Sequence, residues 1–233
     1  MLPQLDSYEA ICRRFEWAVP EFFNIGMDLC DKWAADAHRL ALIHETRDGR
    51  TIRYTFADIR RLSNQAANLF AARGIEAGDR IGILLPQEPE TAVAHIAAYK
   101  IGAIAVPLFT LFGFDALQFR LSDCGAKLLV TDATGIAKID QIRSALPQLQ
   151  SVFCIDGEPP GTANFGEALR GFPDRFAPHQ TRADDPALII YTSGTTGFPK
   201  GAMHSQKSFV LGDRKSTRLN SSHVSLSRMP SSA

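Results

Sequence analysis

One segment in the first third of the chain repeats hydrophobic residues at helical spacing. The repeating positions are Ile59, Leu62, Ala66, Leu69 and Phe70. Because they recur every three or four residues, they share one face of an amphipathic helix. Thr55 and Asp58 form a capping-box pair at its start, and Gly74 supplies a stop signal. The pattern therefore predicts a helix that buries one side.

After this helix, short hydrophobic runs alternate with segments of helical character. The run from Arg80 to Pro86 is almost continuously apolar, as in a strand covered on both faces. We predict strands at 80–86, 105–109, 126–132, 151–156 and 187–191, and helices at 90–100, 114–122 and 136–146. The Gly- and Pro-rich segment 157–166 is typical of a surface loop. Strands and helices in turn predict right-handed crossovers and a layered α/β fold with a largely parallel sheet.

The segment from His95 to Phe114 has the length of a membrane span. Lys100 interrupts it, Gly102 suits the end of a helix, and Pro107 would break a continued helix. We therefore predict the end of a buried helix, a turn and a short core strand, and no membrane span.

Composition points to a small-molecule partner. The chain has 233 residues, of which 45% are hydrophobic, and its 25 basic and 25 acidic side chains give a formal net charge of zero. The charges are interspersed, so the sequence offers no basic face for nucleic acid. The four cysteines have no CxxC spacing and no secretory leader precedes them, which predicts reduced thiols and a cytoplasmic protein.

The last residues differ from everything before them. In 213–233, seven of 21 residues are serine and no periodicity remains, which is typical of a disordered segment. Residues 213–223 and 227–233 also resemble the translation of a ligation adapter used in DNA sequencing, with residues 224–226 where its index lies. We expect 213–233 to be a non-native, disordered tail, and 1–212 to be the native part.

The strongest candidate site is the segment "TSGTTGFPKG", which follows the last predicted strand. The residues suited to phosphate are Thr192, Ser193, Gly194, Thr195, Thr196, Gly197, Lys200 and Gly201. Glycines let backbone N–H groups converge on an anion, the hydroxyls add donors, and Lys200 adds a mobile positive charge. Its place after a strand agrees with the rule that ligands gather at the carboxyl ends of strands in open α/β sheets.

Other phosphate and nucleophile motifs are absent from the sequence. Five residues after Gly194 comes Pro199, where the Walker pattern requires Gly followed by Lys. No GxGxxG turn and no GxSxG elbow occurs, which disfavours dinucleotide-dependent oxidoreductases and serine hydrolases. On spacing alone, a flexible turn without a ligand remains an alternative.

The phosphate segment resembles the signature loop of the adenylate-forming superfamily of acyl-CoA synthetases, luciferases and peptide-synthetase adenylation domains. The blocks "YTFADIRRLSNQAANLF" and "YKIGAIAVPLFTLF" resemble two further family blocks in order and spacing. The opening "FFNIGMDLCDKWA" is more similar to the acetyl-CoA and medium-chain acyl-CoA synthetase branch. The resemblance covers about Phe22 to Gly212, and implies the N-terminal portion of the adenylation domain, truncated after the phosphate loop.

The resemblance implies a ligase that joins a short- or medium-chain carboxylate to CoA through an acyl-adenylate, with ATP, Mg²⁺ and CoA as cofactors and cosubstrates, in fatty acid metabolism. In the matching loop, Thr192, Ser193, Thr195, Thr196 and Lys200 would hold the β- and γ-phosphates. His204 follows the loop and is a weaker candidate for contact with the acyl-adenylate, because a lone histidine at this place is more often a packing or solvent-exposed residue. We expect no other catalytic residue and no metal ligand in this chain.

The same resemblance implies that the adenine and ribose contacts, a magnesium carboxylate and the adenylation lysine follow the loop. We therefore expect this chain alone to be inactive. Two alternatives remain: a nucleotide-binding relative without ligase activity, and an adenylation domain that loads a carrier protein instead of CoA. The acyl group and the oligomeric state do not follow from the sequence.

Overall fold

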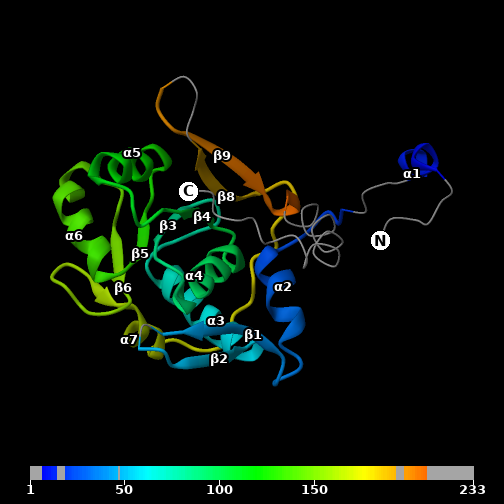
Figure 1. Cartoon of the computed structure of the whole chain (residues 1–233), viewed down its shortest axis with the longest axis horizontal. Helices are drawn as coiled ribbons and strands as arrows, with labels where there is room; N and C mark the ends of the chain where they lie inside the picture. The colour runs from blue at the N-terminus through cyan, green and yellow to red at the C-terminus, as the bar shows by residue number, and fades with distance from the viewer. Residues whose placement is uncertain (1–6, 15–18, 47, 193–196, 209–233) are drawn as a thin grey trace, which may run out of the picture.

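A mostly parallel sheet forms the centre of the molecule (Figure 1). The computed structural model describes residues 7–14, 19–46, 48–192 and 197–208. The sheet order is β7-β6-β5-β3-β4-β8-β9, and every neighbouring pair is parallel except the antiparallel β8 and β9. The strands are β3 (Arg80–Leu84), β4 (Ile104–Pro107), β5 (Leu128–Thr131), β6 (Ser151–Cys154), β7 (Ala163–Asn164), β8 (Pro186–Thr192) and β9 (Lys200–Ser205). The predicted layered α/β fold is confirmed.

Helices cover both faces of this sheet (Figure 1). They are α3 (Phe56–Ala72), α4 (Pro89–Lys100) and α7 (Phe165–Arg170) on one face, and α5 (Phe114–Cys124) and α6 (Ala133–Ile142) on the other. The chain moves from β3 to β4 through α4 and returns past β3 to β5 through α5. Right-handed crossovers in opposite directions require helices on opposite faces, which is the arrangement observed.

Successive side chains of the central strands enter two separate hydrophobic cores. In β5, Leu128 and Val130 belong to the core under α3 and α4, whereas Leu129 belongs to the core under α5 and α6. Ala105 and Val106 of β4 divide in the same way. Because alternate residues of a strand point to opposite faces, a strand between two helix layers must be apolar at every position. This explains why the sequence shows continuous rather than alternating hydrophobic runs.

The predicted strands and most helices appear with ends that differ by one or two residues, within the usual disagreement between definitions. The capping box of α3 is confirmed, since the Thr55 side chain accepts from the Asp58 amide and the Asp58 carboxylate accepts from the Thr55 amide. The segment of membrane-span length contains the end of α4, Gly102 at φ +73° and the strand β4, as predicted. No helix in the described ranges is long and apolar enough to cross a membrane.

The interpretation of 157–166 as a surface loop was wrong at its end. Asn164 and the residue before it form β7, and Phe165 begins α7. The Phe165 side chain is fully buried, with ring centroids 6.2 Å from Phe70 and 5.9 Å from Phe153. A buried phenylalanine draws this segment to the sheet although its Gly and Pro content favours a loop.

The helix predicted at 136–146 is also shifted. It spans Ala133–Ile142 because the Asp132 carboxylate accepts from the Gly135 amide and caps the first turn. A 3₁₀ turn η2 (Arg143–Ala145) follows.

The first part of the chain holds elements that the sequence pattern did not predict. They are the helices α1 (Tyr8–Arg14) and α2 (Ile25–Leu29), the 3₁₀ turn η1 (Asp31–Trp33) and the antiparallel pair β1 (Leu40–Glu45) and β2 (Thr51–Thr55). β2 leads directly into α3, so this small sheet lies beside the helix layer formed by α3 and α4 (Figure 1).

A fully buried lysine joins α4 to this first part. The Lys100 ammonium lies 2.7 Å from Asp31 Oδ1, and it donates to Asn64 Oδ1 at 2.6 Å and to Ser63 Oγ at 3.0 Å. Burial lowers the pKa of Lys100, and the Asp31 carboxylate opposes that shift. A buried ammonium needs such partners, because an unpaired charge in the protein interior is strongly destabilising. Lys100 therefore holds η1, α3 and α4 together.

The prediction of reduced thiols is confirmed for the three cysteines whose surroundings are described. Cys30, Cys124 and Cys154 are free and buried. Burial raises the pKa of Cys30 to about 12 and that of Cys124 and Cys154 to about 11. Thiols of this kind are packing residues, since the thiolate is the reactive form.

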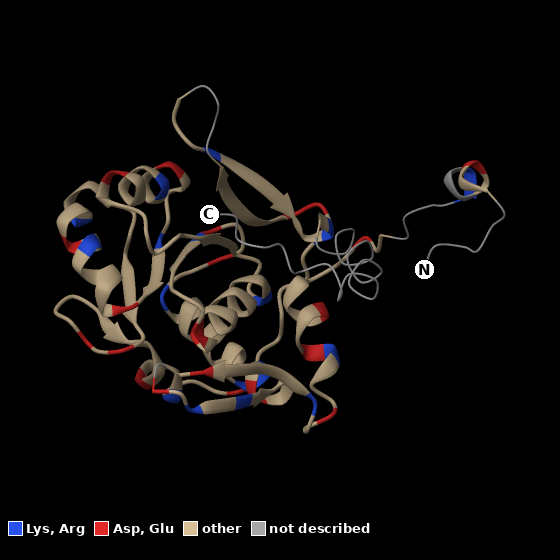
Figure 2. Cartoon of the chain, viewed as in Figure 1, with Lys and Arg blue, Asp and Glu red and all other residues tan. Residues whose placement is uncertain are grey.

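Acidic and basic residues are interspersed along the ribbon, and neither sign is gathered on one element (Figure 2).

Replacing Asp31 with asparagine is expected to lower the free energy of unfolding by about 3 kcal/mol, because it leaves the buried Lys100 ammonium without a counter-charge. Urea unfolding measures the change. Asp28→Asn is the matched control, since its partner Lys32 is exposed and such pairs contribute less than about 1 kcal/mol. Equal effects of the two substitutions would contradict the structural role of Lys100.

Candidate functional site

The predicted phosphate loop connects the antiparallel strands β8 and β9. In their register Thr192 faces Lys200, and Tyr191 faces Gly201. Ser193, Gly194, Thr195 and Thr196 lie outside the described residues. Figure 1 shows that the β8–β9 hairpin projects beyond the rest of the sheet. The structure thus brings Thr192 and Lys200, eight positions apart in the sequence, to opposite sides of the loop's base.

The loop leaves the sheet at its carboxyl edge. β8 runs parallel to β4, so its end at Thr192 lies on the same edge as the loop that follows Pro107. Two of the phenylalanines near this edge are strongly exposed, Phe109 at 61% and Phe198 at 78%. In this sheet order the connections change from one side to the other between β3 and β5, which is the topological switch point. The predicted phosphate loop instead follows β8, which lies on the far side of β4. The site is therefore at the expected edge but away from that switch point.

The two faces of the hairpin carry different residues. Paired residues of antiparallel strands point to the same side, so Thr192, Lys200 and His204 share one face, and Tyr191 and Gly201 share the other. Lys200 is exposed and His204 is partly buried opposite Leu188. Four residues separate them along β9, about 13 Å at about 3.3 Å per residue. The proposed role of His204 stays a prediction.

Lys200 is the only formally charged residue between Pro186 and Ser205. It therefore sets the charge at the base of the loop, and the ribbon of the hairpin is otherwise uncharged in Figure 2. Gly197 has φ +129°, a backbone conformation that favours glycine, and it lies inside the loop. A cation, hydroxyls and a left-handed glycine are the components of an anion-binding turn.

Tyr191 fastens the opposite face of the hairpin to α5. Its hydroxyl lies 2.5 Å from Asp123 Oδ2 and 3.2 Å from the carbonyl oxygen of Arg120. Burial, and then the hydrogen bond to Asp123, raises the pKa of Tyr191, so the phenol stays protonated. Since a phenol has one proton to donate, the shorter contact makes Asp123 its acceptor.

Aromatic contacts extend this attachment to the loop itself. The Phe119 ring stacks on Phe198 with centroids 5.3 Å apart and meets the Tyr191 ring edge-on at 6.4 Å. The Arg120 guanidinium lies 4.0 Å from the Phe112 ring centroid and 5.6 Å from that of Tyr191. A side chain at position 201 would place its Cβ 3.0 Å from Ile189 and 3.3 Å from the Tyr191 ring. Glycine at this position avoids both close contacts.

The other end of the hairpin is fastened to α2. Gln206 is fully buried directly after β9, and its Oε1 accepts from the Ile25 amide at 2.9 Å. The Gln206 backbone N–H donates to the carbonyl oxygen of Asp185 at 2.9 Å. The hairpin thus has one attachment near the loop, through Tyr191, and one at its base.

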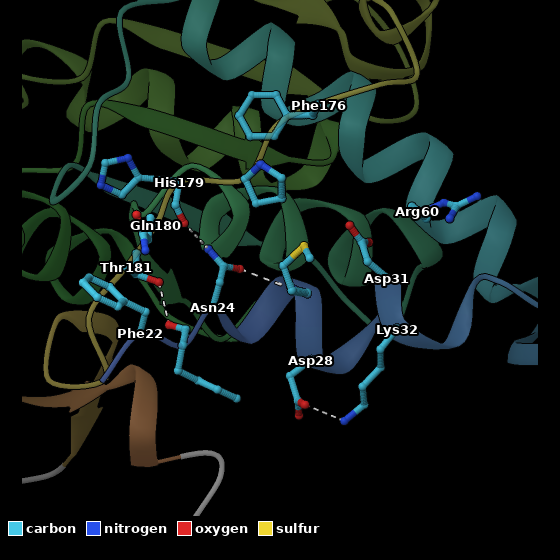
Figure 3. A pocket seen from close by; sticks show the side chains of 13 residues that line it. Phe22, Asn24, Asp28, Asp31, Lys32, Arg60, Phe176, His179, Gln180 and Thr181 are labelled. Carbon is cyan, nitrogen blue, oxygen red and sulfur yellow. Dashed lines mark hydrogen bonds and ion pairs between the residues drawn. The ribbon is translucent and has the colours of Figure 1, made fainter. Parts of the chain in front are cut away.

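A wide groove of about 770 Å³ lies between α2 and the segment that leads to β8 (Figure 3). Asn24 crosses its floor and donates to the carbonyl oxygens of Tyr99 at 2.8 Å and His179 at 3.1 Å. Thr181 Oγ1 donates to the carbonyl oxygen of Phe23 at 2.6 Å. The lining residues are Phe22, Phe23, Asn24, Met27, Asp28, Asp31, Lys32, Arg60, Phe176, Pro178, His179, Gln180 and Thr181.

None of the phosphate-loop residues that the structure describes lines this groove. Several of its polar groups already serve the fold: Asp28 pairs with Lys32 and Asp31 with the buried Lys100. The groove is therefore part of the framework that carries β8, and the candidate site is the hairpin loop. Within the described ranges, no three His, Cys, Asp or Glu side chains are placed to hold a metal ion.

Sequence reasoning missed the residues of α5 that contact the hairpin. Phe119, Arg120 and Asp123 are about seventy positions from Tyr191, with sequence separations of 71 and 68 for the two polar contacts. A single sequence has no signal for such pairing. The aromatic residue just before the glycine-rich loop was the one available hint.

Comparison with known proteins agrees with the predicted family and fold. Residues 30–232 match the family described as AMP-binding enzyme. The human mitochondrial acyl-coenzyme A synthetase ACSM5 is 34% identical over 202 residues, which are 83% of this chain and 35% of that protein. The acetyl-coenzyme A synthetase of Bacillus subtilis (strain 168) is 34% identical over 225 residues, which are 88% of this chain and 38% of that protein.

Solved structures give the same result. An anthranilate CoA ligase, AuaEII, in complex with anthranoyl-AMP has a TM-score of 0.78 and 28% identity, over 84% of this chain and 37% of that one. The acyl-CoA synthetase of Brucella canis has a TM-score of 0.79 and 29% identity, over 89% and 39%. The chain thus spans little more than a third of the length of these relatives. Because the family model matches most of its length, the chain belongs to the AMP-binding enzyme family.

Proposed function

We propose that the whole protein is an AMP-forming acyl-CoA synthetase, of which this chain supplies the phosphate loop. In the first half-reaction a carboxylate oxygen attacks the α-phosphorus of ATP, and pyrophosphate leaves with the electron pair of the broken P–O bond. In the second half-reaction the sulfur of CoA attacks the acyl carbon of the adenylate and AMP leaves. A short- or medium-chain carboxylate is the proposed acid, and a cytoplasmic location is proposed with it.

The observation that carries this proposal is the hairpin that places Thr192 opposite Lys200 at the base of the glycine-rich loop. A mobile ammonium beside several hydroxyl and amide donors suits the outer phosphates of a nucleoside triphosphate. The relatives named above support the acid and thiol substrates, since their names specify acyl- or acetyl-CoA synthetases. The ligase structure that contains anthranoyl-AMP supports an adenylate intermediate.

The proposed task of the loop is to bind and orient rather than to form covalent bonds. Lys200 and the hydroxyls of Thr192, Ser193, Thr195 and Thr196 would hold the β- and γ-phosphates, which keeps the α-phosphorus in line with the attacking carboxylate. Negative charge accumulates on the leaving pyrophosphate, and an ammonium already in place stabilises it without reorganisation.

Mg²⁺ would enter bound to the phosphates of ATP and neutralise part of their charge. The described residues supply no cluster of carboxylates or histidines for it, so no residue of this chain is assigned to the ion. A ligand from elsewhere in the whole protein is part of the proposal.

Two other functions differ from this one in what they require. A nucleotide-binding relative without ligase activity would bind ATP but form no acyl-adenylate. An adenylation domain would transfer the acyl group to a carrier protein instead of CoA. The names of the curated relatives favour CoA over a carrier protein.

Lys200→Ala in the full-length protein is expected to raise the KM for ATP at least tenfold and to slow adenylation, while the thermal midpoint stays unchanged. The reason is that a charge-assisted hydrogen bond contributes about 1.5–3 kcal/mol, and 1.4 kcal/mol is tenfold in affinity. ATP–pyrophosphate exchange at varied ATP measures both quantities.

Lys207→Ala is the matched control, because it removes the same charge from a lysine just after β9 that pairs with Asp184. Its kinetic constants are expected to equal those of the wild type. Unchanged ATP kinetics in Lys200→Ala would contradict the assignment of the loop.

The 233-residue chain by itself is expected to give no carboxylate-dependent ATP–pyrophosphate exchange, because the proposed adenine contacts and adenylation lysine belong to the remainder of the whole protein. The assay uses a panel of short- and medium-chain carboxylates, with the full-length protein as positive control. Exchange above background with the chain alone would show that it contains a complete active site.

A further inference from the structure

The β8–β9 hairpin has little support from the sheet itself. β8 pairs with β4 at one register, Ala105 with Leu188, and the last residues of β8 extend past that contact. Ile190 and Met203 in this part are 38% and 60% exposed. Any fixed placement of the loop base must therefore come from side chains outside the sheet.

We propose that Tyr191 and Asp123, with the stacked rings of Phe119 and Phe198, form a positioning device that holds the phosphate loop in its binding geometry. We call these four residues the hairpin anchor. The inference rests on the proposed function, because the loop must bind phosphate for its placement to matter.

The chemistry of the anchor suits a fixed attachment. The Tyr191 phenol donates to a carboxylate, and charge-assisted hydrogen bonds are shorter and stronger than neutral ones. The raised pKa of Tyr191 keeps its proton in place at neutral and mildly alkaline pH. Because Tyr191 comes directly before Thr192, a fixed phenol also fixes the start of the loop.

The aromatic contact fixes the other side of the loop. Phe198 lies two residues before Lys200 and is 78% exposed, yet its ring stacks on Phe119 at 5.3 Å with 15° between the ring planes. A ring pair of this kind adds attraction beyond the burial of its area. Both ends of the loop are thus attached to the same helix, α5, which is rigidly packed on the sheet through Leu117 and Leu121.

Contacts of Arg120 stabilise α5 where it meets the hairpin. Arg120 is 7% exposed, its Nη1 donates to the carbonyl oxygen of Ala116 at 2.8 Å, and its guanidinium covers the Phe112 and Tyr191 rings. Phe112 precedes α5 and Tyr191 lies near the end of β8, so Arg120 packs between the helix start and the hairpin. The anchor therefore transmits the position of α5 to the loop.

The test uses the full-length protein and compares Tyr191→Phe, Asp123→Ala and Asp123→Asn. Tyr191→Phe and Asp123→Ala are expected to raise the KM for ATP about five- to tenfold, with the KM for carboxylate and CoA within twofold of wild type. Asp123→Asn keeps an oxygen acceptor and is expected to stay within about threefold. The double variant Tyr191→Phe/Asp123→Ala is expected to equal the worse single variant, since both remove one interaction.

A matched control and a further anchor variant complete the test. Asp115→Ala removes an exposed carboxylate from the first turn of the same helix and is expected to behave as wild type. Phe198→Ala alters an exposed ring and is expected to fold normally, with a rise of about threefold in the KM for ATP.

Wild-type ATP kinetics in Tyr191→Phe, Asp123→Ala and Phe198→Ala would overturn the inference. So would an equal rise in the KM of all three substrates with a lower thermal midpoint, because that pattern indicates a purely structural role. Lys200→Ala separates the two hypotheses. If it too leaves ATP kinetics unchanged, the proposed function fails; if it alone raises the KM for ATP, only the anchor fails.

Discussion

Burial of the central sheet on both faces is the constraint on which the rest of the structure depends. Leu128, Leu129 and Val130 of β5 are all fully buried, although they point to opposite sides. A strand enclosed in this way has no side chain free for a ligand. Polar chemistry is therefore confined to the loops at the ends of the strands, and the glycine-rich loop lies at the carboxyl end of β8.

The β8–β9 hairpin places the candidate site outside the part of the sheet that is buried on both faces. β9 is antiparallel and has no further strand beside it within the described part of the chain. Exposed strand edges have unpaired backbone groups and little to hold them. Side-chain contacts take the place of a further strand beside β9. Gln206 attaches the base of the hairpin, and Tyr191 attaches it near the loop. Such contacts fix the base of the loop.

The sequence predicted those features that follow from local patterns. Two-sided burial shows in the sequence as continuous apolar runs, and the Thr55 and Asp58 pair marks the start of α3. The loop itself was predicted from its residue types. Ser193, Gly194, Thr195 and Thr196 lie outside the described residues, so their role stays a prediction.

Features that depend on distant contacts could not be predicted in this way. β7 and α7 exist because Phe165 reaches a core made by residues far away in the sequence. β9 has exposed residues and no alternating apolar pattern, so only its pairing with β8 reveals a strand. Lys100 was expected only to interrupt a hydrophobic run, whereas burial and the Asp31 carboxylate make it a link between elements. In each case the deciding energy is a contact between segments, which no window of sequence contains.

The energetics of ordering explain why a phosphate loop of this composition benefits from an attached base. Fixing the backbone of one residue opposes binding by about 1–2 kcal/mol, and glycines lose more freedom than other residues. Each hydrogen bond to a charged phosphate contributes about 1.5–3 kcal/mol, so ordering the whole loop from a free state would consume most of the gain. In the proposed function, a base held at Tyr191 and Phe198 reduces the number of residues whose freedom binding would remove. Such pre-organisation lowers the free-energy cost of binding the proposed triphosphate.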